Sequence, residues 1–107
     1  MSDSQRSSDI LDSTALHGVM ADHPHWEVRD SALVRSVTVP SFADGIALVA
    51  AVAAVADEVD HHPDIDIRWT TITFRLSSHS AGGITDRDAD MCGRIDAIVD
   101  ERVPQPL

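Results

Sequence analysis

The sequence predicts an α+β fold in the order α-β-β-α-β-β-α, a four-stranded antiparallel sheet with helices packed on one face. Three observations predict it. The spacing of apolar residues switches several times between the helical and the strand period. Helix-start signals precede two of the helical segments. Two pairs of short alternating segments are each separated by a few polar residues, as in β-hairpins.

The chain has 107 residues, which fits one domain. We expect a single domain over residues 9–101, a disordered tail over 1–8 and a C-terminal tail over 102–107. All eight basic residues are arginine against 18 acidic ones, so the formal net charge is −10. This charge argues against binding to nucleic acid and to anionic membranes. The chain shows no signal-peptide pattern and no apolar run of membrane-spanning length, so we expect a cytoplasmic protein.

The first helix and the first hairpin follow from a change of period. Apolar residues recur at helical spacing from Ile10 to Met20, and His23-Pro24 ends that segment. Alternation then begins at Trp26 and resumes after Asp30-Ser31, which predicts a hairpin that ends at Pro40. Trp26 is interpreted as a core residue or as the wall of a pocket.

Ser41 and Asp44 predict the start of a second helix, because they resemble a capping box with Asp in place of Glu. This helix, from Phe42 to about Val59, is rich in alanine and apolar around most of its girth. Such a helix is expected to be buried on more than one side.

The second hairpin is predicted from two alternating segments, 65–69 and 72–76, that flank Thr70-Thr71. With those threonines as the turn, every apolar residue faces an apolar partner on one side of the sheet. Trp69 is therefore predicted to lie in the core. The predicted pairs are Trp69 with Ile72, Ile67 with Phe74, and Ile65 with Leu76.

The last helix is predicted from Thr85, with Asp88 three positions later as a second capping box, to about Asp100. Gly82-Gly83 breaks the preceding strand. Asp88 is interpreted as a helix cap rather than a catalytic group. Cys92 lies among apolar residues and is the single cysteine, so we expect a buried, unreactive thiol.

Three histidines form the candidate site. If the predicted register of the second hairpin is continued outward, His62 falls opposite His79, with His61 beside it. Pro63 holds His62 in extended backbone, where neighbouring side chains point to opposite sides. An irregular turn is therefore needed to bring His61 and His62 into one pocket.

Five acidic residues lie within 57–66, around the two adjacent histidines. Nearby carboxylates fix the tautomer or favour the protonated form of an imidazole, and Asp57 and Asp60 are the candidates for this role. The residues themselves leave three interpretations open. In the first interpretation, His61-His62-Pro63 is a helix-ending turn and His79 is a surface residue. In the second, His61, His62 and His79 form a zinc site. In the third, the histidines carry out metal-free acid–base catalysis on a small ligand.

The spacing of these residues resembles the signature of the pterin-4a-carbinolamine dehydratases. The signature runs Asp57, three residues, His61-His62-Pro63, five residues, Trp69, nine residues, His79, eight residues, Asp88. Flanking segments are similar as well, and the resemblance covers about residues 26 to 98. The sequence departs from the family pattern at Asp30-Ser31, where a glycine-containing turn is common, and at Val37 and Val39, which are often aromatic.

The resemblance implies a hydro-lyase that converts 4a-hydroxytetrahydropterin to quinonoid dihydropterin and water, in tetrahydrobiopterin recycling. It implies no metal and no cofactor, because the pterin is the substrate. His61, His62 and His79 match the catalytic and substrate-contacting set, and Pro63, Ser78, Ser80 and Ala81 match positions that line the pterin pocket. The implied partners are a second copy or three further copies of the chain, and an aromatic amino-acid hydroxylase as a functional link. The alternatives are a non-catalytic dimerisation module and the zinc site.

Overall fold

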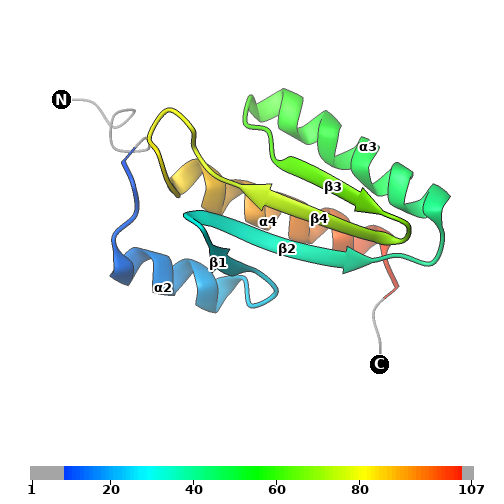
Figure 1. Cartoon of the computed structure of the whole chain (residues 1–107), viewed down its shortest axis with the longest axis horizontal. Coiled ribbons are helices and arrows are strands. Elements are labelled where there is room, and N and C mark those ends of the chain that lie inside the picture. Colours follow the sequence, from blue (N-terminus) through cyan, green and yellow to red (C-terminus); the bar gives the residue numbers. More distant parts are fainter. Residues whose placement is uncertain (1–8, 105–107) are drawn as a thin grey trace.

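A computed structural model describes residues 9–104 of the chain (Figure 1). The tail expected over 1–8 and the last three residues, 105–107, of the tail expected over 102–107 lie outside the described residues. The predicted element order and the α+β fold are confirmed. The elements are α2 (Ser13–Asp22), β1 (Glu27–Arg29), β2 (Ala32–Thr38), α3 (Phe42–Val59), β3 (Asp64–Arg68), β4 (Thr71–Leu76) and α4 (Asp86–Arg102).

The four strands form one antiparallel sheet in the order β1-β2-β4-β3. In Figure 1, α4 runs behind the central strands, α3 runs alongside β3, and α2 lies beside β1. The core fills the space between one face of the sheet and the two long helices. It is built from alternate residues of β2 and β4 and from one stripe of each helix, among them Leu33, Phe74, Leu48 and Ile95.

The predicted helix starts are present in the structure. Ser41 caps α3, where its hydroxyl accepts a 3.1 Å hydrogen bond from the Asp44 amide. Thr85 and Asp88 form a complete capping box at the start of α4. Helix α4 continues two residues beyond the expected end, and Val103 after it is buried. Within residues 9–104, no helix has both the length and the apolarity to cross a membrane.

The predicted register of the second hairpin is wrong by two residues. Ile67 pairs with Ile72 and Ile65 pairs with Phe74, so the turn consists of Trp69 and Thr70. A turn at Thr70-Thr71 would have placed β-branched residues where primed turns require a positive φ. In the observed turn only Trp69 has a positive φ, of +56°. A slip of two residues keeps the side chains within β3 and β4 on their predicted faces, but it moves Trp69 from the strand into the turn.

The predictions for the two tryptophans have different outcomes. Trp69 is not in the core: its position in the turn leaves it 76% exposed, and it stacks on Phe42 with 6.5 Å between ring centroids. Trp26 is buried in the core, and its indole N–H donates a 2.7 Å hydrogen bond to Asp96 of α4. Asp96 also accepts from His23 and Arg35, so one carboxylate ties the α2–β1 segment and β2 to α4.

Helix α3 is buried along one stripe only, which corrects the expectation of burial on more than one side. The buried residues are Gly45, Leu48, Val52 and Ala56. The sheet and α4 pack on that stripe, and no other element of the described chain covers the outer side. Exposed apolar residues therefore remain on the outer side, namely Phe42, Ala43, Ile46, Ala47, Ala50, Ala53 and Ala54.

Candidate functional site

The end of α3 positions the two adjacent histidines. Asp60 adopts the left-handed conformation, with φ +54° and ψ +46°, and terminates the helix. The amides of Asp60 and His61 both donate to the Ala56 carbonyl. This is the irregular turn that the sequence required. It directs His61 toward α4 while His62 reaches back to the last turn of α3.

His61 is paired with a fully buried carboxylate. Its Nε2 lies 2.6 Å from Oδ1 of Asp88, and the imidazole side chain is 11% exposed. The second oxygen of Asp88 accepts 2.9 Å hydrogen bonds from the Ser78 hydroxyl and from the Thr85 amide. Ser78 and Thr85 are hydrogen-bonded to each other at 2.7 Å. Asp88 thus caps α4 and contacts a candidate catalytic histidine at the same time.

This arrangement fits one tautomer of His61. The Thr85 amide is an obligatory donor, so Oδ2 of Asp88 acts as an acceptor there. An ionised Asp88 accepts through both oxygens, and His61 then carries its proton on Nε2. Nδ1 of the neutral ring is left with a lone pair, which is the group a general base needs.

His62 forms a second, more exposed pair. Its Nε2 lies 2.8 Å from Oδ1 of Asp57, where the imidazole is 55% exposed and the carboxylate 80%. Asp57 is thus the residue that contacts His62, one of the two partners predicted for the histidines. The carboxylate of Asp60 has no hydrogen bond within residues 9–104; this residue instead supplies the left-handed turn, and its carbonyl accepts from Arg87.

His79 lies in the loop between β4 and α4 and is exposed. The predicted pairing of His62 with His79 is wrong, because the observed register continues His62 toward Ser77. Of the other predicted pocket residues, Ser80 is exposed, Pro63 and Ala81 are partly buried, and the Ser78 hydroxyl faces inward to Asp88.

A cavity of about 340 Å³ lies beside His61, between the end of α3 and the first turns of α4. Arg87 and Arg94 face it together with two carboxylates, so its walls offer both donors and acceptors. The hydrogen bond from Arg94 to Asp90 raises the pKa of this arginine. Neither His62 nor His79 is part of this cavity, whose lining is Val59, His61, Asp86, Arg87, Asp90 and Arg94.

Asp88 and Arg87 are the neighbours of the histidines that the sequence interpretation missed. The signal for Asp88 was the capping box, whose geometry uses only part of the carboxylate's four acceptor positions. Within the described range 9–104, no group of three or more His, Cys, Asp or Glu side chains is arranged to hold a metal ion. His61, His62 and His79 are therefore not gathered as a set of ligands among the described residues.

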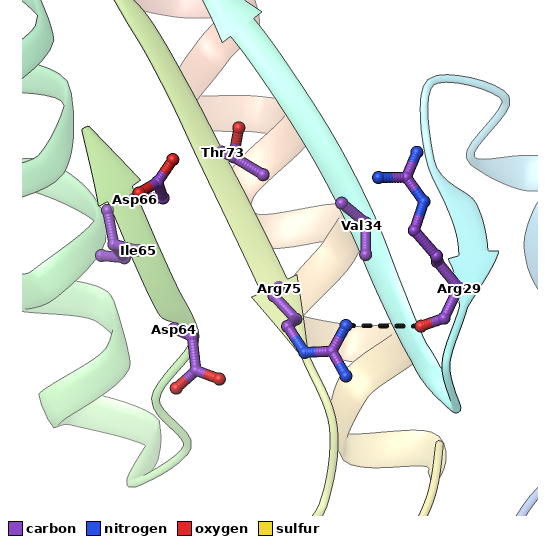
Figure 2. A pocket seen from close by; sticks show the side chains of 7 residues that line it. All are labelled: Arg29, Val34, Asp64, Ile65, Asp66, Thr73 and Arg75. Carbon is purple, nitrogen blue, oxygen red and sulfur yellow. Dashed lines mark hydrogen bonds between the residues drawn. The ribbon is translucent and has the colours of Figure 1, made fainter. Parts of the chain in front are cut away.

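A second cavity, of about 260 Å³, lies on the sheet face that the helices leave uncovered (Figure 2). Figure 2 shows Arg75 reaching across β2 to the main chain of Arg29 rather than toward Asp64, its neighbour on β3. Arg75 donates to the carbonyls of Arg29 and Asp30, at 3.4 and 3.1 Å. This arginine therefore holds the β1–β2 turn, and the cavity contains none of the motif residues.

Comparison with known proteins reveals extended similarity. A family model described as "Pterin 4 alpha carbinolamine dehydratase" matches residues 9–98. A protein of Mycobacterium sp. (strain KMS) is 57% identical over 91 residues, which are 85% of this chain and 97% of that protein. A protein of Mycobacterium avium (strain 104) is 50% identical over 90 residues, 84% of this chain and 96% of that protein. Both are named "Putative pterin-4-alpha-carbinolamine dehydratase".

Two solved structures share the fold. The transcriptional coactivator/pterin dehydratase from Brucella melitensis superimposes with a TM-score of 0.80 at 25% identity, over 84% of this chain and 98% of that one. A pterin dehydratase-like protein described as a RuBisCO assembly factor in the alpha-carboxysome superimposes with a TM-score of 0.56 at 23% identity. That match covers 68% of this chain and 84% of the other, and it supports the fold alone.

Proposed function

This chain belongs to the pterin-4a-carbinolamine dehydratase family, and from that premise we propose that it dehydrates 4a-hydroxytetrahydropterin to quinonoid dihydropterin and water. The single observation that carries the proposal is the pairing of His61 with buried Asp88 at 2.6 Å. This pairing orients one imidazole of the family motif and supports assigning it the tautomer with its proton on Nε2, which is suited to proton transfer.

The reaction is an elimination. The bond between C4a and the hydroxyl oxygen breaks, and that oxygen leaves as water after it gains a proton. N5 loses its proton, and the electron pair of the N–H bond becomes the second bond between N5 and C4a. Hydroxide is a poor leaving group near neutral pH, so the reaction needs one proton donor and one proton acceptor. Histidine suits both roles because its unperturbed pKa lies near neutrality.

The structure supports a division of labour among the three histidines. His61 has a fixed orientation and presents Nδ1, which suits acceptance of the N5 proton. His62 and His79 are exposed and are proposed to donate to the hydroxyl or to contact the substrate. Pro63, Ser78, Ser80 and Ala81 are proposed to line the pterin site, Ser78 through its main chain because its hydroxyl is engaged with Asp88.

The proposed chemistry needs no redox cofactor, since oxidation states do not change in a dehydration, and in this proposal histidine side chains rather than a metal transfer the protons. The biological role that follows is tetrahydrobiopterin recycling in the cytoplasm, linked to an aromatic amino-acid hydroxylase that produces the 4a-hydroxypterin.

The decisive experiment measures dehydration of 4a-hydroxytetrahydrobiopterin by the full chain and by His61→Ala, His62→Ala and His79→Ala variants. Each well-placed acid or base contributes about 10²- to 10⁴-fold, so kcat is expected to fall by that order in the catalytic positions. His17→Ala, in an exposed position on α2, is the matched control and should retain full activity.

Three outcomes would contradict the proposal. Full activity in all three histidine variants would remove the catalytic assignment. Loss of activity with a chelator and recovery with Zn²⁺ would favour the metal interpretation. A folded wild-type chain that binds a pterin without turnover would favour the non-catalytic binding module.

We also propose that the chain forms a homodimer or homotetramer through the outer side of α3. That side is apolar and continues into the exposed Phe42–Trp69 stack, and exposed apolar surface of this kind marks interaction sites. Sedimentation of the wild-type chain should give a mass above that of one copy, and Ala47→Arg should lower it. Ser13→Arg on α2 is the control; Asp57→Arg at the exposed end of α3 is unsuitable because Asp57 contacts His62. Equal masses for the wild-type chain and Ala47→Arg would contradict the proposal.

A further inference from the structure

The loop that carries His79 has few attachments of its own. Its base is closed by a 2.8 Å hydrogen bond from the Ser78 amide to the Gly83 carbonyl. The amides of Ala81 and Gly82 donate to the Ser78 carbonyl at 3.0 and 2.9 Å. His79 itself is exposed at the tip, and its side chain has no hydrogen bond within residues 9–104. The direction of His79 therefore depends on how the base of this loop is held.

The chain segment before α2 contacts the base of the His79 loop. The Leu11 amide donates a 2.8 Å hydrogen bond to the carbonyl of Ile84, which directly precedes the Thr85 cap of α4. Ile10 packs on Gly83 so closely that a Cβ added to this glycine would lie 3.3 Å from Ile10 Cδ1. Figure 1 shows the segment before α2 passing beside the β4–α4 loop.

These contacts are specific rather than incidental. The side chain of Ile84 is 5% exposed, so its carbonyl lies in a region where an unmatched acceptor is costly. Ile10 contacts the Gly83 position with three of its side-chain carbons and otherwise remains exposed. Leu11 is anchored on the core, which makes the segment a fixed support.

We infer that Ile10 and Leu11 are positioning residues for His79, acting through Gly83 and Ile84. The inference rests on the proposed function, in which His79 contacts the pterin or transfers a proton. Ile10 and Leu11 themselves touch neither substrate nor histidine; they fix the loop from which His79 extends. The effect is expected mainly in kcat, because a loosened loop loses the productive orientation of the imidazole.

Substitutions in the full chain test this inference. The double variant Ile10→Gly/Leu11→Pro removes the side chain that packs on Gly83 and the amide that donates to Ile84, whereas Asp9→Ala, an exposed change beside them, is the matched control. Amide hydrogen exchange at Ala81 and Gly82 should be about three- to tenfold faster in the double variant, as expected for the loss of one hydrogen bond and its packing. The control should exchange like the wild-type chain.

A pair of substitutions tests the contact between Ile10 and Gly83 by itself. Gly83→Ala should crowd Ile10, accelerate exchange in the loop and shift the imidazole NMR signals of His79 but not those of His17. Adding Ile10→Ala to this variant should relieve the crowding. The exchange rates in the loop and the imidazole signals of His79 should then return toward their wild-type values. A merely destabilised fold would not show this rescue.

The two proposals fail separately. If the wild-type chain has no dehydratase activity, the function is wrong, and exchange and NMR still measure the support of the loop. If the Ile10→Gly/Leu11→Pro variant keeps wild-type loop exchange and wild-type kcat, Ile10 and Leu11 do not position His79. Faster exchange with unchanged kcat would also overturn their role in the reaction.

Discussion

Asp88 is the residue on which helix formation and the candidate chemistry meet. Its carboxylate completes the capping box of α4, accepts from buried Ser78 and contacts His61. A single buried group with these partners cannot be replaced without leaving some of them unmatched. The residue therefore has to be tested for stability and for activity together.

We predict that Asp88→Asn lowers kcat by about 10²-fold and the free energy of unfolding by about 1–3 kcal/mol. An amide offers one acceptor oxygen and a donor where the carboxylate offers two acceptors, so either His61 or the Thr85 cap loses its partner. Denaturant titration and a kcat–pH profile measure the two effects. Asp100→Asn, an exposed change near the other end of the same helix and outside the cavity beside His61, is the control, and equal behaviour of the two variants would contradict the prediction.

Cys92 is predicted to be unreactive in the folded chain. Burial, with further contributions from Asp96 and Asp88, raises the pKa of the Cys92 thiol well above its ordinary value. A thiol reagent should therefore react with the chain only after denaturant unfolds it.

The same shift gives a pH dependence with a defined sign. Below the ordinary thiol pKa, about 8.5, the folded and unfolded chains both keep the proton and Cys92 has no effect. Above it the unfolded chain loses the proton while the folded chain keeps it, so stability falls as the pH rises. A Cys92→Ala variant should lack this part of the alkaline loss, and identical slopes in the two chains would argue against it.

Among the elements, the β1–β2 hairpin has the least favourable turn. Asp30 and Ser31 have φ values of +50° and +61°, where glycine is the preferred residue. Strand β4 and the residue after it compensate, because Arg75 donates to the Asp30 carbonyl and the Ser77 hydroxyl donates to the Ser31 carbonyl. The departure from the family pattern at these two positions thus carries a conformational cost that neighbouring side chains offset.

We predict that Ser31→Gly raises the free energy of unfolding by about 1 kcal/mol, the order of the left-handed penalty for a residue with a Cβ. Ser31→Ala keeps that penalty and should give no gain. Thermal unfolding of both variants measures the difference. A gain of equal size in both would show that the side chain, not the backbone angle, is responsible.

The hairpins also show where sequence reasoning succeeds and where it stops. The faces of β3 and β4 could be predicted because alternation reports which side chains share a core. The exact register could not, because a slip of two residues satisfies the same alternation, and the choice depends on whether Trp69 or Thr70 takes the first turn position with its positive φ. The role of Asp88 as a helix cap could be predicted from local spacing. Its contact with His61, 27 positions away, could not, because only the folded chain brings the two residues together.

For the molecule as a whole, the charge of −10 is spread over a small domain and acts against compactness. Some of the eight arginines pair locally with acidic side chains, as Arg68 does with Asp66 and Arg94 with Asp90, and the acidic residues remain in excess. The remaining carboxylates on the surface repel one another over distances that salt screens.

We predict that raising the ionic strength from about 0.01 M to about 0.1 M increases Tm by about 3 °C, because the Debye length falls from roughly 30 to roughly 10 Å. Differential scanning calorimetry in NaCl measures this. A neutral osmolyte at matched osmolality controls for effects other than screening, and a lower Tm in salt would show that attractive ion pairs outweigh the repulsion.

The two tryptophans give the molecule a pair of built-in optical reporters. The sequence contains no tyrosine, so its near-ultraviolet emission comes from Trp26, 2% exposed beside Asp96, and from Trp69, 76% exposed on the β3–β4 turn. A soluble quencher such as acrylamide should reduce the Trp69 emission and leave that of Trp26 nearly intact. Assembly through the outer side of α3 would then lower the fraction of the emission that acrylamide quenches. Unfolding would shift the emission of the protected Trp26 to longer wavelength. Both changes can be measured in one unlabelled sample.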